Sequence, residues 1–120
     1  MVGYLNKNEL NVILKATKEL TELIPEAHSI KRKRFFFDAF NRNVTNYLKS
    51  KMPKKAKIVG VVYKVRTNAG TRSYPNMVNE LEVDYACINK VTDKSIHLLY
   101  NNGLWGKWVL KEKIIAYIYE

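Results

Sequence analysis

Apolar residues recur every three or four positions through the first 25 residues of the chain. This spacing follows the 3.6-residue period of an amphipathic helix. Asn6 and Glu9 have the spacing of a capping box, and Pro25 cannot continue a helix. We therefore expect a first helix of about 17 residues between these two signals. Its buried face would consist of Leu10, Ile13, Leu14, Thr17, Leu20 and Ile24.

A second helical pattern begins after Ser29 and extends towards Met52, just before Pro53. We expect the Ser29 hydroxyl to accept a hydrogen bond from a free backbone amide of the first turn. At about 100° per residue, one sector of this helix is apolar and should pack against the first helix. That sector contains Ile30, Phe37, Phe40, Val44, Tyr47 and Leu48. The segment 1–52 is therefore predicted to form a helical hairpin.

The hydrophobic period changes to two after residue 57. From Val59 to Val65, every second residue is a valine or tyrosine, as on the buried face of a β-strand. A long loop over 68–77 and the hairpin dipeptide Asn102-Gly103 separate further strand patterns. The expected strands cover residues 59–67, 80–91, 95–100, 104–110 and 114–119, with a single helical turn at 111–113 before the last strand.

These elements predict an α+β fold in a single domain of residues 1–120. The helical hairpin over 1–52 would be followed by a small five-stranded antiparallel barrel over 57–120. One long early loop, two tight hairpins and a short turn before the last strand match the strand order of an SH3-like barrel. A PUA-like or OB-type barrel fits the same pattern. A length of 120 residues is usual for one domain, and 47% apolar residues exclude a disordered chain.

The sequence contains no signal for a membrane or for an oxidising compartment. No apolar run approaches the roughly 18 residues of a bilayer crossing, and no signal-peptide pattern is present at the start. One cysteine, Cys87, and two histidines cannot supply an internal disulfide or a zinc site of Cys and His ligands. We therefore expect a cytoplasmic protein without a membrane partner.

Positive charge is the most informative feature of the composition. The chain has 21 Lys and Arg against 11 Asp and Glu, which gives a formal net charge of +10. Residues 31–57 contain ten of the cations and one acid, Asp38, so the rest of the chain is almost neutral. Such a concentrated basic segment favours a polyanionic partner. The ten cations are Lys31, Arg32, Lys33, Arg34, Arg42, Lys49, Lys51, Lys54, Lys55 and Lys57.

An aromatic residue accompanies the cations of the second helix. On the helical wheel, Lys31, Arg42 and Lys49 fall together opposite the apolar sector, with Phe35 beside them. Cations contact phosphates, and an exposed ring can stack on an unpaired base. Alternatively, Phe35 packs against the second half of the protein.

Further aromatic residues lie in the predicted barrel. Arg72 and Tyr74 occupy the tip of the long loop, and together with Trp105 and Lys107 they would form a second stacking surface for a single strand. Trp105 could equally be buried, because its spacing from Trp108 places the two indoles on opposite faces of a strand. We expect Trp108 to seal the junction between the barrel and the helices.

The sequence holds no convincing set of catalytic residues. Glu80, Glu82 and Asp84 alternate along one strand and could hold a divalent cation, but solvated strand-edge charges explain the same pattern. Cys87 and His97 could suggest a thiol nucleophile, yet a cysteine within a strand is usually a small buried residue. Phosphate-loop, dinucleotide-binding and zincin motifs are absent from the sequence. We therefore expect no enzyme activity, no metal and no cofactor.

These observations predict a small basic, non-enzymatic regulator that binds nucleic acid, with RNA or single-stranded DNA preferred over duplex DNA. Duplex binding would require the second helix to present Asn41, Arg42 and Asn46 to base edges. Twelve Asn and no Gln suggest a phage or plasmid of a low-GC bacterium. The alternative function is a protein-binding module or inhibitor that docks its basic face on an acidic host protein.

Overall fold

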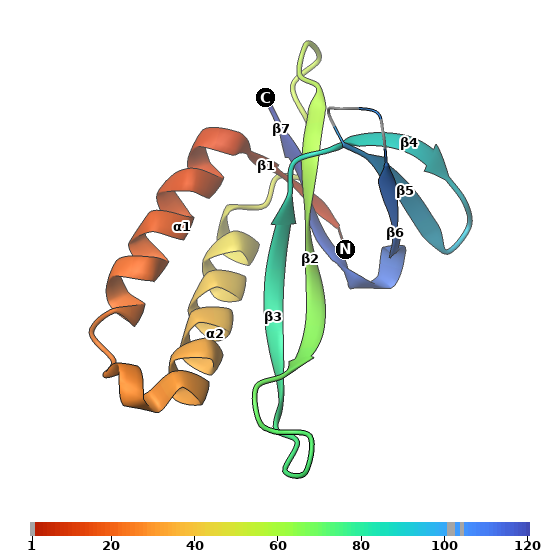
Figure 1. Ribbon diagram of the computed structural model, residues 1–120. Coiled ribbons are helices and arrows are strands. Elements are labelled where there is room, and N and C mark those ends of the chain that lie inside the picture. Colours follow the sequence, from red (N-terminus) through yellow and green to blue (C-terminus); the bar gives the residue numbers. More distant parts are fainter. Residues whose placement is uncertain (1, 101–102, 104) are drawn as a thin grey trace.

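The computed structural model describes residues 2–100, 103 and 105–120, and within them the fold is α+β with two α-helices and two β-sheets. The four-stranded sheet lies between the pair of helices and the three-stranded sheet (Figure 1). The elements in chain order are β1 (Gly3–Asn6), α1 (Lys7–Thr21), the 3₁₀ helix η1 (Glu26–His28), α2 (Ser29–Tyr47), β2 (Ile58–Asn68), β3 (Met77–Asp84), β4 (Cys87–Val91), β5 (Ser95–Leu99), β6 (Gly106–Leu110), the 3₁₀ helix η2 (Lys111–Lys113) and β7 (Ile114–Tyr119).

Helix α1 begins where the sequence predicts. The Asn6 side chain accepts a hydrogen bond from the Asn8 backbone amide at 2.8 Å, which caps the first turn. Leu10, Ile13 and Thr17 are buried, and the Thr17 hydroxyl donates to the Ile13 carbonyl at 2.8 Å. Leu20 is exposed, so the predicted buried face is wrong at that position.

Helix α2 begins at Ser29 as expected, but its end differs from the prediction. Ser29 is already helical and makes no capping bond, because η1 leads directly into the helix. The helix ends at Tyr47 rather than near Met52, since Leu48 is extended and Lys49 exchanges two backbone hydrogen bonds of 2.8 Å with Tyr4. This long-range pairing leaves Tyr47 at the helix terminus, where its side chain is exposed instead of buried.

The four-stranded sheet has the strand order β1-β7-β2-β3. Strand β1 pairs in parallel with β7, and the sequence analysis missed it because four residues are too few to show a period. The other pairs are antiparallel, and β7 coincides with the predicted last strand after the predicted turn at 111–113.

The predicted strand over 80–91 is divided between the two sheets. Strand β3 pairs with β2 up to Asp84, and from Cys87 onwards β4 pairs with β5 in the second sheet, whose order is β4-β5-β6. The bend brings the Asp84 carbonyl so close to Gly60 that a Cβ atom there would overlap it. No closed barrel is formed by the described strands, so the prediction of a five-stranded barrel is not confirmed.

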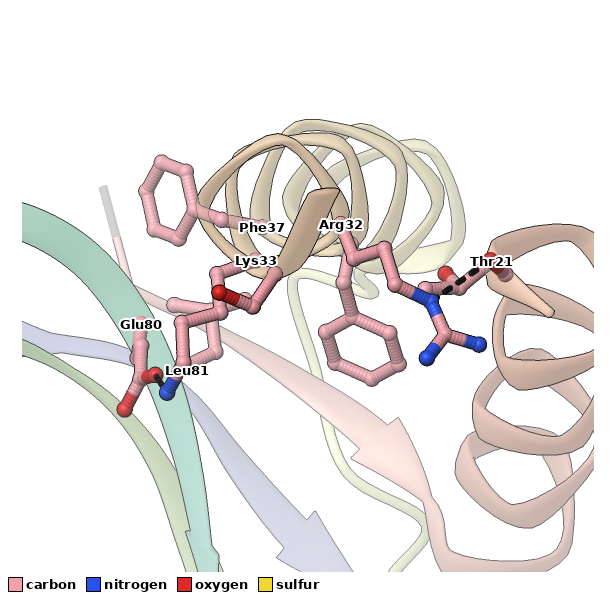
Figure 2. A pocket seen from close by; sticks show the side chains of 8 residues that line it. Thr21, Arg32, Lys33, Phe37, Glu80 and Leu81 are labelled. Carbon is pink, nitrogen blue, oxygen red and sulfur yellow. Dashed lines mark hydrogen bonds and ion pairs between the residues drawn. The ribbon is translucent and has the colours of Figure 1, made fainter. Parts of the chain in front are cut away.

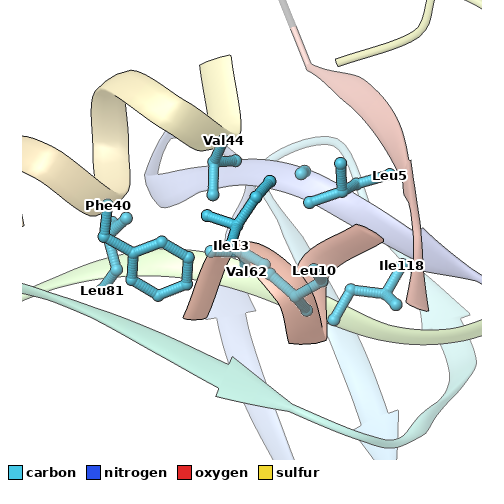
Figure 3. Packing of buried hydrophobic residues seen from close by; sticks show 9 residues of the cluster. Leu5, Leu10, Ile13, Phe40, Val44, Val62, Leu81 and Ile118 are labelled. Atoms are coloured by element: carbon cyan, nitrogen blue, oxygen red, sulfur yellow. The ribbon is translucent and has the colours of Figure 1, made fainter. Parts of the chain in front are cut away.

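Two hydrophobic clusters lie on opposite faces of the four-stranded sheet. One cluster packs the helices on the sheet and includes Phe40, Val62 and Ile118 (Figure 3). The other joins the two sheets and includes Val61 and Ile96. Neighbouring β2 residues therefore serve different clusters, as the alternation of side chains along a strand requires. The first cluster also shows that the core of the helical hairpin is shared with strands from 57–120.

In the part of the chain that is described, neither α1 nor α2 combines the length and apolar character that a bilayer crossing demands.

Of the predicted hairpin dipeptide, Asn102 lies outside the described residues, whereas Gly103 has the positive φ of 66° expected of a tight turn.

Candidate nucleic-acid interface

Helix α2 separates the basic segment 31–57 into two groups of cations. The helix has 19 residues, and at about 1.5 Å per residue its ends lie roughly 28 Å apart. In Figure 1 the start of α2 and the β2–β3 loop lie at the lower end of the molecule, and the chain between α2 and β2 lies at the upper end. The sequence shows that the cations are concentrated in one segment, but it does not show that they occupy opposite ends of the molecule.

The lower group contains Lys31 and Arg34. Together with Arg72 and Tyr74 of the β2–β3 loop, they form what we call the loop-end cluster. Arg34 Nη2 donates to Asn76 Oδ1 at 2.9 Å, and this bond joins α2 to the β2–β3 loop. Tyr74 is 81% exposed at the loop tip. The structure thus joins Arg34 to the loop that carries Arg72 and Tyr74, although the two segments are far apart in the sequence.

The β2–β3 loop has an ordered hydrogen-bond pattern of its own. Asn68 Oδ1 accepts from the backbone amides of Gly70 and Asn76, both at 2.9 Å. Thr71 Oγ1 accepts from the Tyr74 amide at 3.0 Å. These side-chain bonds to the backbone hold the tip in one conformation, so Arg72 and Tyr74 are presented without a large ordering cost.

Arg32 and Lys33 bind the protein itself rather than facing solvent freely. Arg32 Nε lies 3.4 Å from the Thr21 carbonyl at the end of α1, and Lys33 Nζ lies 2.9 Å from Glu80 Oε1 of β3 (Figure 2). Both line a hollow of about 400 Å³ between the two helices and β3. Both side chains therefore join the hairpin to neighbouring elements, and their role in nucleic-acid binding stays a prediction.

The upper group consists of Lys51, Lys54, Lys55 and Lys57, which we call the upper lysine cluster. All four side chains are exposed, and none makes an ion pair with a described carboxylate. The backbone of Lys57 exchanges hydrogen bonds with Glu120 at 3.0 and 3.1 Å, which fixes the end of this segment beside β7. These lysines are available to an external anion.

Lys49 differs from its lysine neighbours. Its Nζ atom lies 2.7 Å from Glu9 Oε1 and 3.1 Å from the Tyr119 hydroxyl. The hydrogen bond to Glu9, followed by that to Tyr119, raises the pKa of Lys49 above its ordinary value. Lys49 also lies beyond the end of α2, so the predicted grouping with Lys31 and Arg42 on one helix is wrong.

The outer face of α2 connects the two ends. Lys31, Phe35 and Arg42 lie on this face, and Asp38 is the one acid between them. Phe35 is 36% exposed, and neither hydrophobic cluster includes its ring. The predicted combination of an aromatic ring with cations is therefore present on this helix.

The two tryptophans occupy different environments. Trp105 is exposed and stacks on Tyr100, with ring centroids 4.7 Å apart. Trp108 is 53% exposed on the outer face of the second sheet and packs on His97 at 4.9 Å. The helices cover the opposite side of the molecule, so the prediction that Trp108 seals their junction is wrong.

Lys107 belongs to a polar cluster between the two sheets. Its Nζ atom lies 2.5 Å from the Tyr63 hydroxyl and 3.6 Å from Glu82 Oε2. The Tyr63 hydroxyl also lies 2.7 Å from Glu82 Oε2 and 2.6 Å from Asp84 Oδ2. Burial, and then the hydrogen bonds with Asp84 and Glu82, raises the pKa of Tyr63 well above its usual value, so this side chain remains a neutral phenol.

This cluster uses the carboxylates that the sequence suggested as metal ligands. Tyr100 donates to Asp84 Oδ2 at 3.2 Å, whereas Glu80 points to Lys33. In the described part of the chain, no three His, Cys, Asp or Glu side chains are placed to share a metal ion. The tyrosine partners were missed because nothing local in the sequence relates Tyr63 of β2 to Glu82 and Asp84 of β3, which lie beside it only once the two strands pair.

Two exposed cations on β2 were also missed. Lys64 and Arg66 alternate along the strand that leads into the β2–β3 loop, and both are exposed. Their alternation with Val65 was the available signal. They extend the loop-end cluster towards the middle of β2.

Comparison with known family models, curated proteins and solved structures gives no match to this chain.

Proposed function

We propose that the protein is a non-enzymatic regulator that binds nucleic acid along the outer face of α2. The observation that carries this proposal is the order of three basic segments along the molecule: the loop-end cluster at one end, α2, and the upper lysine cluster at the other end (Figure 1). Nucleic acid is a linear polyanion and matches such an extended arrangement better than a compact anion does. Lys33, Lys49 and Lys107 make internal ion pairs and are not assigned to phosphates.

Single strands are the proposed targets because exposed rings lie beside the cations. Tyr74 belongs to the loop-end cluster, and Phe35 lies between Lys31 and Arg42 on α2. Stacking of an unpaired base on such a ring contributes roughly 1–3 kcal/mol, and a duplex does not offer its bases in this way. This supports RNA or single-stranded DNA over duplex DNA.

Binding should depend strongly on salt. If six of the exposed cations each neutralise a phosphate, the slope of log K against log salt is about −5 on duplex DNA and about −4 on single strands. On duplex DNA the affinity then falls roughly a thousandfold between 50 and 200 mM salt. Fluorescence anisotropy with labelled RNA, single-stranded DNA and duplex DNA at several salt concentrations measures this slope and ranks the three ligands.

A charge-reversal pair tests the location. Arg34→Glu with Arg72→Glu should weaken binding and reduce the salt slope by about two. The matched control is Lys90→Glu with Lys94→Glu, which changes the net charge equally on the second sheet, where both lysines are exposed. Equal losses in the two variants, or a slope near zero for the unaltered protein, would refute the proposal. Retention of a cellular partner after nuclease treatment would favour docking on an acidic protein instead.

We also propose that β2 to β7 form an open variant of the SH3-like arrangement. Three features support this: the long β2–β3 loop, the 3₁₀ turn before β7, and the return of β7 to pair with β2. The bend between Asp84 and Cys87 then corresponds to the point at which one strand passes between the two sheets.

A further inference from the structure

Arg32 is a partly buried cation without a carboxylate partner. Its Nε atom lies 3.4 Å from the Thr21 carbonyl oxygen, which is longer than the usual hydrogen bond of about 2.7–3.2 Å. Among the described residues, no carboxylate lies within ion-pair distance of Arg32, and its two Nη nitrogens have no acceptor. The guanidinium therefore keeps several donors for an external anion.

These donors border the hollow of about 400 Å³ between the two helices and β3. Figure 2 shows the Arg32 side chain extending from α2 towards Thr21 and the Lys33 side chain extending towards Glu80, and all four residues line the hollow. The volume lies within the range of roughly 300–1,000 Å³ that is typical of small-molecule sites.

The rest of the lining is largely apolar. Phe36 and Phe37 of α2 are half-buried and pack against the cluster that joins the helices to the sheet, and Leu81 of β3 belongs to that cluster. Because the core holds these side chains, the apolar part of the hollow is formed before any ligand binds. An apolar group that enters it avoids much of the cost of ordering the site.

The charges that line the hollow sum to one excess positive charge. Lys33 and Glu80 pair with each other at 2.9 Å, so Arg32 is the cation left over. Lys64 lies opposite Leu81 in the β2–β3 pair and adds to the positive potential on this face without lining the hollow. The remaining charged residues of α1, η1 and α2 also lie outside the lining, and Lys18 and Glu22 border a separate hollow on α1.

We propose that this hollow binds a small organic carboxylate with an apolar body. The carboxylate accepts two hydrogen bonds from the Arg32 guanidinium, whose planar geometry matches it, and the body lies on Phe36 and Leu81. The Ser29 hydroxyl, which also lines the hollow and has no partner among the described residues, donates to the same carboxylate.

The single excess charge favours a carboxylate over a phosphate. A phosphate monoester carries about −1.5 to −2 at neutral pH and would need a second unpaired cation, whereas Lys33 is already paired with Glu80. The inference goes beyond the proposed nucleic-acid binding and does not depend on it, because Lys31, Arg34 and Arg72 do not line the hollow.

Nuclear magnetic resonance of the isotope-labelled full chain, free of nucleic acid, tests the proposal with 3-phenylpropionate as the probe. A dissociation constant of about 1 mM is expected for a ligand of this size. The shifts should concentrate at the amides of Ser29 and Leu81 and at the Arg32 Nε–H group. The neutral 3-phenylpropanamide has the same shape and should bind about tenfold more weakly, since it lacks the charge.

Two variants separate the role of the charge from that of the space. Arg32→Gln should weaken 3-phenylpropionate about tenfold and remove its advantage over the amide. The matched control is Arg42→Gln, because Arg42 is exposed on the same helix and does not line the hollow. Ser29→Trp should fill the hollow and block both probes, and circular dichroism should show an intact fold because Ser29 is exposed and makes no capping bond.

The absence of shifts around the hollow at about 10 mM probe would overturn the proposal. Equal affinity for the amide, or an Arg32→Gln variant that binds as the unaltered protein does, would also overturn it. Tighter binding of phenyl phosphate or adenosine monophosphate would identify a phosphate site and so refute the carboxylate. Each of these results is independent of the proposed function, because no nucleic-acid strand takes part in the measurement.

Discussion

The ammonium group of Lys49 lies 2.7 Å from the Glu9 carboxylate and so links the end of the helical hairpin to its beginning. The same atom reaches the Tyr119 hydroxyl of β7 at 3.1 Å. Of the lysines in the basic segment, Lys49 thus has a structural function, whereas Lys54 and Lys55 have exposed side chains without a described partner. This difference leads to opposite effects of substitution.

Lys49→Ala should lower the free energy of unfolding by about 0.5–1 kcal/mol, as expected for a partly exposed ion pair, and should change nucleic-acid affinity little. Lys54→Ala with Lys55→Ala should weaken nucleic-acid binding and leave the free energy of unfolding almost unchanged. Urea denaturation and anisotropy titration on the same samples measure both quantities. The division of roles is wrong if Lys49→Ala reduces affinity as much as the double variant does.

Tyr63→Phe should destabilise the contact between the two sheets. The substitution removes the hydroxyl that joins Glu82, Asp84 and Lys107 and leaves the buried ring in place. Hydrogen bonds to charged groups contribute about 1.5–3 kcal/mol, and we expect a loss of about 2 kcal/mol in urea denaturation. Tyr74→Phe removes an exposed hydroxyl at a loop tip and is the control, with no loss expected.

The stability of the protein should decrease at alkaline pH because of Tyr63. Its pKa is raised in the folded state, mainly by burial and then by Asp84 and Glu82, so the folded chain holds the phenolic proton more tightly than the unfolded chain does. The stabilisation is complete below about pH 10, where an unfolded tyrosine keeps its proton, and is lost as the pH rises above that value.

Urea midpoints at pH 8, 9, 10 and 11 test this effect. One such group contributes at most about 1.4 kcal/mol per pH unit. Tyr63→Phe should make the alkaline decline shallower, and Tyr74→Phe should not. An identical decline in all three proteins would show that Tyr63 does not control the alkaline stability.

Tyr74→Ala should weaken binding to single strands about tenfold, which is within the range for loss of one stacked base. Binding to duplex DNA should hardly change, because paired bases do not stack on the exposed ring. Trp108→Ala is the matched control, since Trp108 is an exposed aromatic residue on the distant sheet. If Tyr74→Ala weakens duplex and single-strand binding equally, the ring contributes no stacking.

The sequence by itself determined the elements whose signals are local. The apolar period and Asn6 located the start of α1, and alternation identified β2 and β7, because each signal lies within one turn or one strand. The concentration of positive charge in residues 31–57 was also evident from the sequence, since it requires only a count of charged residues.

Only the tertiary structure decided what depends on distant residues. Pairing of Lys49 with Tyr4 ended α2 early, and the close approach of Asp84 to Gly60 accompanies the division of the predicted strand between two sheets. Likewise, Glu9 and Glu80 pair with two of the predicted binding cations. Contacts between residues this far apart in the chain produce no periodic pattern in the sequence, because the energy that selects them arises only when the sheets and helices pack together.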